Sequence, residues 1–326
     1  MARLLKWLFA LVALVVVAAG LFVGYFFVRY PDVPAAETVT VPRTPERLAR
    51  GEYLVEHVVG CVACHAERDF SKFSGPVVDG TKGKGGQRFG FGLEPFVLYS
   101  KNITPAGVGD WTDGEVIRAM TAGVSRDGTP LFPLMPYPRY AQLSRDDVEA
   151  IVAYVRTLPS VPSPAPPARH LNFPLPLVVR TIPAAPSHPP RPPATDRIAY
   201  GRYMVNAAVC ADCHTPIDGQ GAPLPGKEFA GGTPFRPGGV GLVRSANLTP
   251  DAGTGLGTWT EAQFVDKFRA FRGVPARTLV GDERLQNSEM PWTSYAGMTD
   301  DDLRAIYAYL RSLPPVVNRV EKFPKE

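Results

Sequence analysis

Two five-residue motifs carry the chemistry that this sequence could perform. The first runs from Cys61 to His65 and the second from Cys210 to His214. Each has the pattern C-x-x-C-H, which is typical of covalent c-type haem attachment. Two thiols three positions apart can form thioethers with the two vinyl groups of one porphyrin, and the adjacent histidine then becomes the proximal ligand of the iron. We therefore predict two haem c groups, attached through these cysteines: Cys61, Cys64, Cys210 and Cys213.

Other uses of the cysteines explain less of the pattern. A thioredoxin-like site needs one C-x-x-C and no histidine. Zinc-binding pairs usually lie closer together than these two motifs, which are 149 residues apart (210 − 61). Two disulfides within the motifs would leave both histidines unexplained. Haem attachment uses all four cysteines of the chain, and it implies an oxidising compartment such as the bacterial periplasm.

The second axial ligand of each iron is predicted to be a methionine. Met135 and Met290 recur in register in the two halves of the sequence, and each precedes a proline in a loop before the final helix. A thioether ligand raises the haem potential and fills the remaining axial position. The alternative is a gap-filling core methionine, which suits Met120 and Met298 better. Three further histidines lie in less favourable places, on the first helix or in the linker: His57, His170 and His188.

A carbonyl group is expected to hold each proximal histidine. Pro76 lies 11 residues after His65, and Pro225 lies 11 residues after His214. A turn at such a proline could offer a carbonyl to the Nδ1–H group and fix the tautomer, although both could equally be ordinary loop prolines. Other residue pairs in register could bond haem propionates or turn backbone: Asn102 with Asn247, and Trp111 with Trp259.

Both haem motifs belong to an internal repeat. Gly51 and Gly201 lead into the motifs, and the offset between equivalent residues varies between 145 and 155. We predict one domain over residues 44–158 and a second over residues 194–326. The linker, residues 159–193, holds 13 prolines and should be extended and semi-rigid. Its apolar centre, residues 171–179, is expected to pack along a domain surface.

The secondary structure of each unit is predicted to be mainly helical. A first helix should end just before each haem motif, and a last helix should end at Pro159 or Pro314. Gly- and Pro-rich loops between the helices suit a domain wrapped around a large apolar cofactor. Capping signals mark the expected helix starts: Thr112 with Glu115, Thr260 with Gln263, Ser144 with Asp147, and Thr299 with Asp302.

The N-terminus, residues 1–30, reads as a membrane anchor. Residues 7–28 form a stretch of 22 residues without a charge, which at about 1.5 Å per residue covers a hydrocarbon core of about 30 Å. A cleavable signal peptide is the alternative, but its apolar region is normally about 7–15 residues. Arg3 and Lys6 should stay cytoplasmic, so that the haem motifs lie outside.

The charge distribution argues against nucleic-acid binding. Residues 44–158 carry 13 Lys/Arg and 14 Asp/Glu, a net charge of −1 (13 − 14). Residues 194–326 carry 15 of each, a net charge of zero. Neither unit is therefore a basic body of the kind that binds a phosphate backbone.

Each unit resembles a class I cytochrome c domain. In that family an N-terminal helix, the haem motif, a loop proline, a methionine ligand and a C-terminal helix follow in this order. The resemblance covers residues 44–158 and 194–315. The motifs Asn-Ile/Leu-Thr-Pro, Trp-Thr and Met-Pro are similar to those of cytochrome c subunits of membrane-bound bacterial dehydrogenases. Those subunits usually carry three haem motifs, whereas this sequence has two.

The resemblance implies electron transfer rather than catalysis. The expected donor is a periplasmic or membrane-bound dehydrogenase, and the expected acceptor is a terminal oxidase or another cytochrome. The alternative is a dihaem enzyme, such as a peroxidase or a thiosulfate-oxidising cytochrome, which needs an iron with an open coordination position. A haem-based sensor would need an output domain, for which the sequence offers no candidate.

Overall fold

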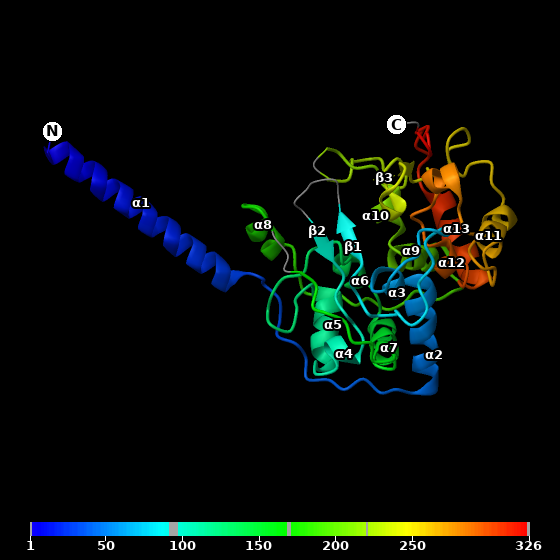
Figure 1. The fold of residues 1–326 in the computed structure, drawn as a ribbon, viewed down its shortest axis with the longest axis horizontal. Coiled ribbons are helices and arrows are strands. Elements are labelled where there is room, and N and C mark those ends of the chain that lie inside the picture. Colours follow the sequence, from blue (N-terminus) through cyan, green and yellow to red (C-terminus); the bar gives the residue numbers. More distant parts are fainter. Residues whose placement is uncertain (1, 91–96, 168–170, 220, 325–326) are drawn as a thin grey trace.

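The N-terminal helix stands apart from the rest of the molecule. The computed structural model describes residues 2–90, 97–167, 171–219 and 221–324, so the candidate His170 lies outside the described residues. Helix α1 (Ala2–Arg29) projects from the globular part (Figure 1). The mean hydropathy of its most apolar 18-residue stretch is 2.7, and this stretch is not buried against protein. It is therefore long and apolar enough to cross a membrane.

The globular part consists of two halves built on one plan, joined by a linker that contains α8 (Leu175–Thr181). The first half, residues 44–158, contains these elements: α2 (Pro45–Tyr53), the π-helix η1 (Leu54–Val58), α3 (Cys61–Cys64), β1 (Arg88–Gly90), β2 (Val97–Tyr99), α4 (Pro105–Val108), α5 (Asp113–Ala122), α6 (Tyr137–Tyr140) and α7 (Arg145–Val155). The second half, residues 194–326, contains these: α9 (Arg197–Ala207), α10 (Cys210–His214), β3 (Pro234–Phe235), the 3-10 helix η2 (Pro237–Gly239), β4 (Val243–Arg244), α11 (Glu261–Arg269), the 3-10 helix η3 (Gly281–Gln286), α12 (Trp292–Tyr295) and α13 (Asp300–Ser312).

Strands contribute little to either half. β1 pairs with β2 as an antiparallel ribbon in which Arg88 faces Tyr99. β3 pairs with β4 in the same way, with Pro234 opposite Arg244. The prediction of a mainly helical fold is therefore confirmed.

The expected capping residues begin the longer helices. Thr112 and Thr260 form capping boxes at α5 and α11, each with a side chain three residues later that bonds back to the cap backbone. Ser144 and Thr299 accept backbone N–H groups at the starts of α7 and α13. These side chains satisfy donors that the helix itself leaves unpaired.

A glycine allows the first and last helices of each half to cross closely. A Cβ atom built on Gly51 of α2 would lie 2.0 Å from the carbonyl oxygen of Ala150 in α7. A Cβ atom on Gly201 of α9 would lie at the same 2.0 Å from the carbonyl oxygen of Ala305 in α13. Any side chain at either position would therefore push the two helices apart.

The π-helix η1 accounts for a shift in the repeat. Seven residues separate Tyr53 from Cys61, whereas six separate Tyr203 from Cys210. In η1 the Val59 N–H bonds the carbonyl five residues back, at 2.7 Å. A π-turn accommodates one extra residue within a helix, so the extra residue does not displace the haem motif that follows.

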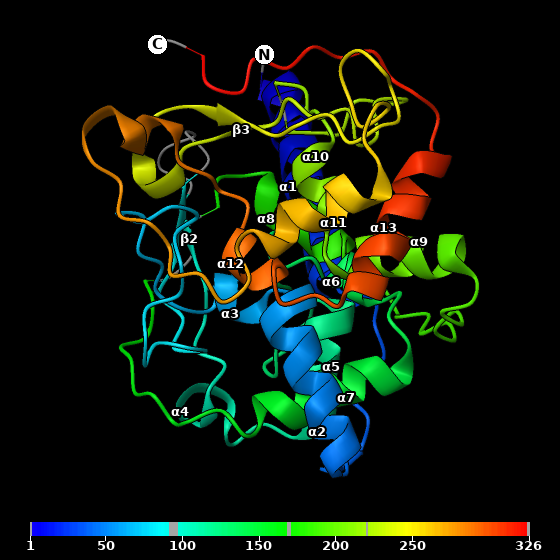
Figure 2. The ribbon, with the colours of Figure 1, turned by 90° about the vertical axis from the view of Figure 1, so that its right-hand side faces the viewer.

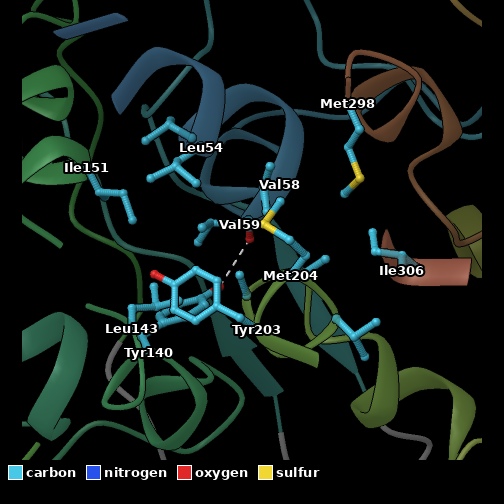
Figure 3. Packing of buried hydrophobic residues seen from close by; sticks show 14 of the residues in the cluster. Leu54, Val58, Val59, Tyr140, Leu143, Ile151, Tyr203, Met204, Met298 and Ile306 are labelled. Atoms are coloured by element: carbon cyan, nitrogen blue, oxygen red, sulfur yellow. Dashed lines mark hydrogen bonds between the residues drawn. The ribbon is translucent and has the colours of Figure 1, made fainter. Parts of the chain in front are cut away.

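The two halves share one hydrophobic core. Buried residues of η1 and α7 and buried residues of α9 and α13 form a single cluster, and the partly buried Leu48 and Tyr53 of α2 pack against it. Figure 3 shows Met204 of α9 close to Val58 and Val59 of the first half. Met204 and Val58 are fully buried, and burying side chains of this size contributes about 1.5–3 kcal/mol each. Separating the halves would expose this surface to water.

A tyrosine of the second half caps the last helix of the first half. The Tyr203 hydroxyl donates to the Asp147 carboxylate at 2.6 Å and accepts the backbone N–H of Ser144 at 3.1 Å. Asp147 is also paired with Arg50 at 2.9 Å. The start of α7 is therefore completed by a residue that belongs to the other half.

The reverse contact completes the exchange. The Tyr53 hydroxyl donates to the Asp302 carboxylate and accepts the backbone N–H of Thr299 at 3.1 Å. Tyr53 and Tyr203 occupy equivalent positions in the repeat, and so do Asp147 and Asp302. The halves therefore face one another about an approximate two-fold axis, with α2 and α9 both near the interface (Figure 2).

Candidate haem sites

Each C-x-x-C-H motif forms one helical turn. α3 holds Cys61 and Cys64, and its C-cap is His65. α10 holds the equivalent residues of the second half. Both turns follow a left-handed residue, Gly60 with φ 71° and Val209 with φ 48°. One turn of helix brings residues three apart onto the same face, so the two thiols of each motif point the same way.

The thiols lie in apolar surroundings but remain accessible. Cys64 and Cys213 are exposed, and Cys61 and Cys210 are half-buried. Burial raises the pKa of Cys61, Cys210 and Cys213 to about 12, and it raises that of Cys64 as well. No cysteine forms a disulfide. Uncharged thiols at the edge of an apolar environment suit contact with a large hydrophobic macrocycle.

A backbone carbonyl fixes the orientation of each motif histidine. Nδ1 of His65 lies 2.7 Å from the carbonyl oxygen of Lys101, and Nδ1 of His214 lies 2.8 Å from that of Ala246. Burial lowers the pKa of both imidazoles. A neutral ring that donates through Nδ1 leaves Nε2 as the ligand atom.

The expectation that Pro76 and Pro225 supply this carbonyl is therefore wrong. The Pro76 carbonyl accepts the backbone N–H of Asp69 at 2.9 Å, within the loop after α3. Pro225 lies just after a bridge that pairs Ile217 with Pro223. In both halves the loop at the proline folds on itself, and a later segment of chain reaches the histidine instead.

The Asn-x-Thr motif positions the segment that does reach the first histidine. The Asn102 side chain accepts the backbone N–H and the hydroxyl of Thr104, at 2.8 and 2.7 Å. Its amide group donates to the carbonyl of Val161 at 2.8 Å, just beyond the end of α7. These hydrogen bonds hold Asn102, which directly follows Lys101, against the chain just beyond α7.

The second half repeats this arrangement. The Asn247 side chain accepts the backbone N–H and the hydroxyl of Thr249, at 2.9 and 2.8 Å, and donates to the carbonyl of Val316 at 2.8 Å. Of the two roles left open for these asparagines, the structure shows the bonding of turn backbone.

A left-handed glycine lets the same segment lie close to the histidine. Gly85 donates its N–H to the carbonyl of His65 at 3.0 Å, with φ 72°. A Cβ atom there would lie 2.5 Å from the backbone of Lys101. Gly231, with φ 73°, bonds His214 in the same way at 2.7 Å. Only glycine combines this backbone conformation with such a close approach.

Met135 and Met290 differ from the other described methionines in exposure. Both are half-buried at the edge of the shared core. Met120, Met204 and Met298 are fully or almost fully buried, which agrees with a packing role for Met120 and Met298. Each of these two half-buried methionines precedes a proline and one helical turn, α6 or α12. Their thioether sulfurs are therefore not enclosed in the core and are accessible enough to bind an iron.

The Met290 loop is held by side chains of the first half. The Ser74 hydroxyl donates to the Met290 carbonyl at 2.7 Å and accepts the backbone N–H of Trp292 at 2.8 Å. The Arg68 guanidinium donates to the Glu289 carboxylate at 2.9 Å and to its carbonyl at 3.3 Å. The loop after one haem motif therefore braces the methionine loop of the other half.

The Met135 loop meets the second half through different contacts. Arg139 of α6 forms an ion pair with Asp212 of the second haem motif at 2.7 Å. The Asn206 amide donates to the Arg139 carbonyl at 2.9 Å. The equivalent contact in the other direction joins Nδ1 of His57 to the Ser294 carbonyl at 3.0 Å. His57 therefore bonds a backbone group in the interface.

The two haem motifs lie near one another. The pKa of Cys213 is raised mainly by burial, and then by the charges of Asp212, Cys210 and Glu289. The Cys64 thiol of the first motif contributes as well. Burial raises the pKa of Tyr295, and the same thiols, Cys64 among them, add to the rise. Electrostatic effects of this kind act over short distances. The two attachment sites are therefore close to one another.

These features fit covalent haem better than a metal-ion site. Among the described residues, no group of three or more His, Cys, Asp or Glu side chains could hold a metal ion. A surface cavity between residues 36–43 and α5 lies away from both motifs. A c-type haem requires thiols for covalent attachment and an imidazole as an iron ligand, and each motif offers both.

Two features of the site left little signal in the sequence. The carbonyl groups of Lys101 and Ala246 belong to the backbone, so no side chain marks them. Tyr53 and Tyr203 repeat in register, but the pattern of apolar residues does not reveal that their hydroxyl groups bond the other half. The nearest available signal was the recurrence of each tyrosine two residues after the helix-crossing glycine.

Comparison with known proteins agrees with this arrangement. Residues 198–314 match the family model for cytochrome c. The cytochrome c subunit of a quinone alcohol dehydrogenase from Gluconobacter oxydans is 31% identical over 82% of this chain and 55% of its own length. The cytochrome c subunit of gluconate 2-dehydrogenase from Pantoea cypripedii is 33% identical over 81% of this chain and 59% of its own length.

A shorter relative is matched over most of its own length. A dihaem c-type cytochrome from Cereibacter sphaeroides is 29% identical over 79% of this chain and 83% of its own length. The chain spans only 55–60% of the alcohol dehydrogenase subunits that it matches. A cytochrome c domain implies covalently bound haem c. The chain therefore contains a cytochrome c domain and is related to cytochrome c subunits of bacterial dehydrogenases and to a dihaem cytochrome c.

Proposed function

We propose that this protein is a membrane-anchored dihaem cytochrome c that transfers electrons in the periplasm. The donor is a periplasmic or membrane-bound dehydrogenase, and the acceptor is a terminal oxidase or another cytochrome of the respiratory chain. The relatives named above, which are cytochrome subunits of dehydrogenases, support the choice of donor. The helix α1 holds the protein in the cytoplasmic membrane as a single pass, with both haem units outside.

The observation that carries this proposal is the duplicated ligand set. His65 and Met135 are the proposed axial ligands in the first unit, and His214 and Met290 are those in the second. Each histidine is oriented by a carbonyl at 2.7 or 2.8 Å, and each methionine is half-buried on a braced loop. Haem c supplies one-electron chemistry when it is bound. The chain supplies attachment, two fixed axial ligands and a rigid interface.

A rigid interface suits electron transfer because little reorganisation accompanies a change of charge. The shared core and the two tyrosine contacts hold the units in one relative position. We infer that the two thiol pairs, Cys61 with Cys64 and Cys210 with Cys213, would hold two haems close together. An electron could therefore enter at one unit and leave from the other without a movement of domains.

The test is a haem count followed by an optical titration of the full chain. We expect two haems per chain in the pyridine haemochrome assay and a sulfur-to-iron charge-transfer band from both ferric haems. One haem per chain would contradict the dihaem proposal. A high-spin signal or peroxide turnover in the half-reduced protein would contradict electron transfer as the sole role, and would favour a dihaem enzyme.

The membrane proposal has its own test. We expect the full chain to remain in the membrane fraction after a carbonate wash, and the haem units to be accessible to protease from the periplasmic side. A mature protein that begins after residue 20 and is released with the soluble periplasm would contradict the anchor while leaving the electron-transfer proposal intact.

A further inference from the structure

The linker contains an apolar segment that faces away from the protein. In residues 171–181, which include α8, Phe173 is 81% exposed and Val178 is 48% exposed, while Val179 is only 1% exposed and packs inward. The sequence predicts that this segment packs along a domain surface, but the structure buries only one side of it. Exposed apolar side chains that lie together can mark a contact with a partner or a membrane.

Arg180 fixes this segment to the end of α1. Its Nε donates to the carbonyl of Tyr30 at 3.0 Å, and its Nη2 donates to that of Phe27 at 3.2 Å. The guanidinium also lies over the Phe27 ring, 4.6 Å from the centroid. The last carbonyls of a helix have no partner within the helix. Arg180 therefore both caps α1 and holds α8 beside its final turn.

This contact determines the level of α8 relative to a membrane. The 22 uncharged residues of α1 span about 33 Å at 1.5 Å per residue, close to the hydrocarbon thickness of about 30 Å. The final turn of α1 then lies at the outer boundary of the hydrocarbon. Figure 1 shows α8 beside this end of α1, between α1 and the first half, and Figure 2 agrees. α8 therefore lies at the same boundary.

The composition of the segment suits that position. Residues 171–181 contain no acidic residue, and their single charge, Arg180, is bonded to backbone carbonyls. Aromatic residues are enriched at membrane interfaces, and α1 ends in an aromatic cluster in which Phe26 and Tyr30 lie 5.0 Å apart. Phe173 would extend this cluster sideways.

We propose that residues 171–181 lie in the outer interface of the lipid bilayer as a second contact of the protein with the membrane, with Phe173 and Val178 directed into the lipid. The inference rests on the proposed membrane anchor. α1 alone leaves the globular part free to rotate about the helix axis. A second contact at a distance from that axis would set which face of the haem units is turned toward the membrane.

The test measures the depth of a spin label on the full chain. Phe173→Cys is labelled in the holoprotein, whose own cysteines are held as thioethers, and the protein is placed in nanodiscs of phosphatidylcholine and phosphatidylglycerol with both haems ferrous. Power saturation then compares collisions with oxygen, which enters the bilayer, and with a water-soluble nickel chelate. Val274→Cys is the matched control, because Val274 is 57% exposed and follows α11, on the far side from α1 (Figure 1).

We expect the ratio of oxygen to nickel accessibility at position 173 to exceed that at position 274 by several-fold. A ratio equal to the control would overturn the proposal, and protection from both reagents would overturn it in favour of a protein partner or a second copy. A label at Leu14→Cys separates the two levels of argument. If that label lies in the bilayer while position 173 is in water, this inference alone fails; if Leu14 is also in water, the anchor fails with it.

Discussion

The two methionine loops of the molecule are held in unequal ways. The Met290 loop is bonded by Ser74 and Arg68, which both belong to the first half. At the equivalent positions of the second half stand Pro223 and Ile217, neither of which has a polar side chain to offer the Met135 loop. The crossing glycines are alike in the two halves, and so are the caps of α5 and α11 and those of α7 and α13.

The two halves therefore differ in their loops more than in the arrangement of their long helices. Ile217 is 39% exposed and Leu134, the counterpart of Glu289, is 37% exposed. The ion pair of one half is thus replaced by two accessible apolar residues in the other. The position of Met290, the proposed distal ligand of the second unit, should depend on the first unit, whereas the reverse dependence of Met135 should be weaker.

Removal of the methionines is expected to have the largest effect. Met290→Ala and Met135→Ala should each lower the potential of one haem and let that iron bind an added ligand such as imidazole or cyanide. Axial ligands set haem potentials over a range of about 0.8 V, so the shift should be easily resolved in a redox titration. If either variant keeps its charge-transfer band and its potential, that methionine is not a ligand.

Loss of a tyrosine hydroxyl is expected to be the next largest effect. Tyr53→Phe removes a hydrogen bond to the Asp302 carboxylate and one from Thr299. Hydrogen bonds to charged groups contribute about 1.5–3 kcal/mol, so the free energy of unfolding should fall by about that amount. Tyr203→Phe should cost less, because Asp147 keeps its ion pairs with Arg50 and Arg191.

Chemical denaturation followed by haem absorbance measures both variants. Tyr154→Phe is the matched control, since its hydroxyl bonds Glu56 within the first half at 2.9 Å. We expect the two interface variants, and not the control, to separate the unfolding transitions of the halves. A single unchanged transition in Tyr53→Phe would contradict a coupling role for this contact.

Ser74→Ala tests the one-way dependence directly. The change removes the hydroxyl that bonds the Met290 carbonyl and the Trp292 N–H, and a hydrogen bond of this kind contributes about 0.5–1.5 kcal/mol. The second haem should lose its methionine at lower temperature, although Ser74 lies in the first half. Ser100→Ala is the control, because that hydroxyl accepts a backbone N–H within its own half at 3.0 Å. Equal losses at both haems in Ser74→Ala would remove the asymmetry.

Acid should weaken the interface by a smaller amount. Burial alone would raise the pKa of Asp147, but hydrogen bonds and charge from Arg50 lower it below its usual value of 3.8. Ionised Asp147 therefore stabilises the fold above the unfolded pKa of about 3.9, and this contribution is lost as the pH falls through the lower folded value. Unfolding free energies measured between pH 5 and about 3 should fall less steeply in Asp147→Asn than in the parent. Arg50→Gln should have the same effect; a parent-like slope in both variants would exclude this pair as the cause.

The local features of the fold could be predicted from the sequence. Capping side chains such as Thr112 and Ser144 act within a few residues, so their spacing alone reveals them. The apolar helix α1 is a matter of length and composition. The recurrence of Met135 and Met290 in register marked them as different from the core methionines, and the structure places both at the edge of the core. Their ligation remains a prediction.

The contacts between distant segments could not be predicted. Pro76 was expected to support His65 because it lies near it in sequence, yet the carbonyl comes from Lys101, 36 residues after the histidine. A loop of this length can fold in many ways, and the hydrogen bonds of Asn102 to Thr104 and Val161 select one of them. The exchange of Tyr53 and Tyr203 likewise depends on how two halves dock, which hydrophobic periodicity does not encode.

The reciprocal tyrosine exchange also has a consequence for the history of the chain. When residue i of one unit meets residue j of the other and the reverse also holds, the contact is isologous, as in symmetric homodimers. A single unit with this tyrosine and this aspartate would carry a surface that complements a second copy of itself. The linker then acts as a tether that raises the effective concentration of one unit around the other. In one chain the loops of the two units can differ, while the contacts about the shared axis hold the helices in place.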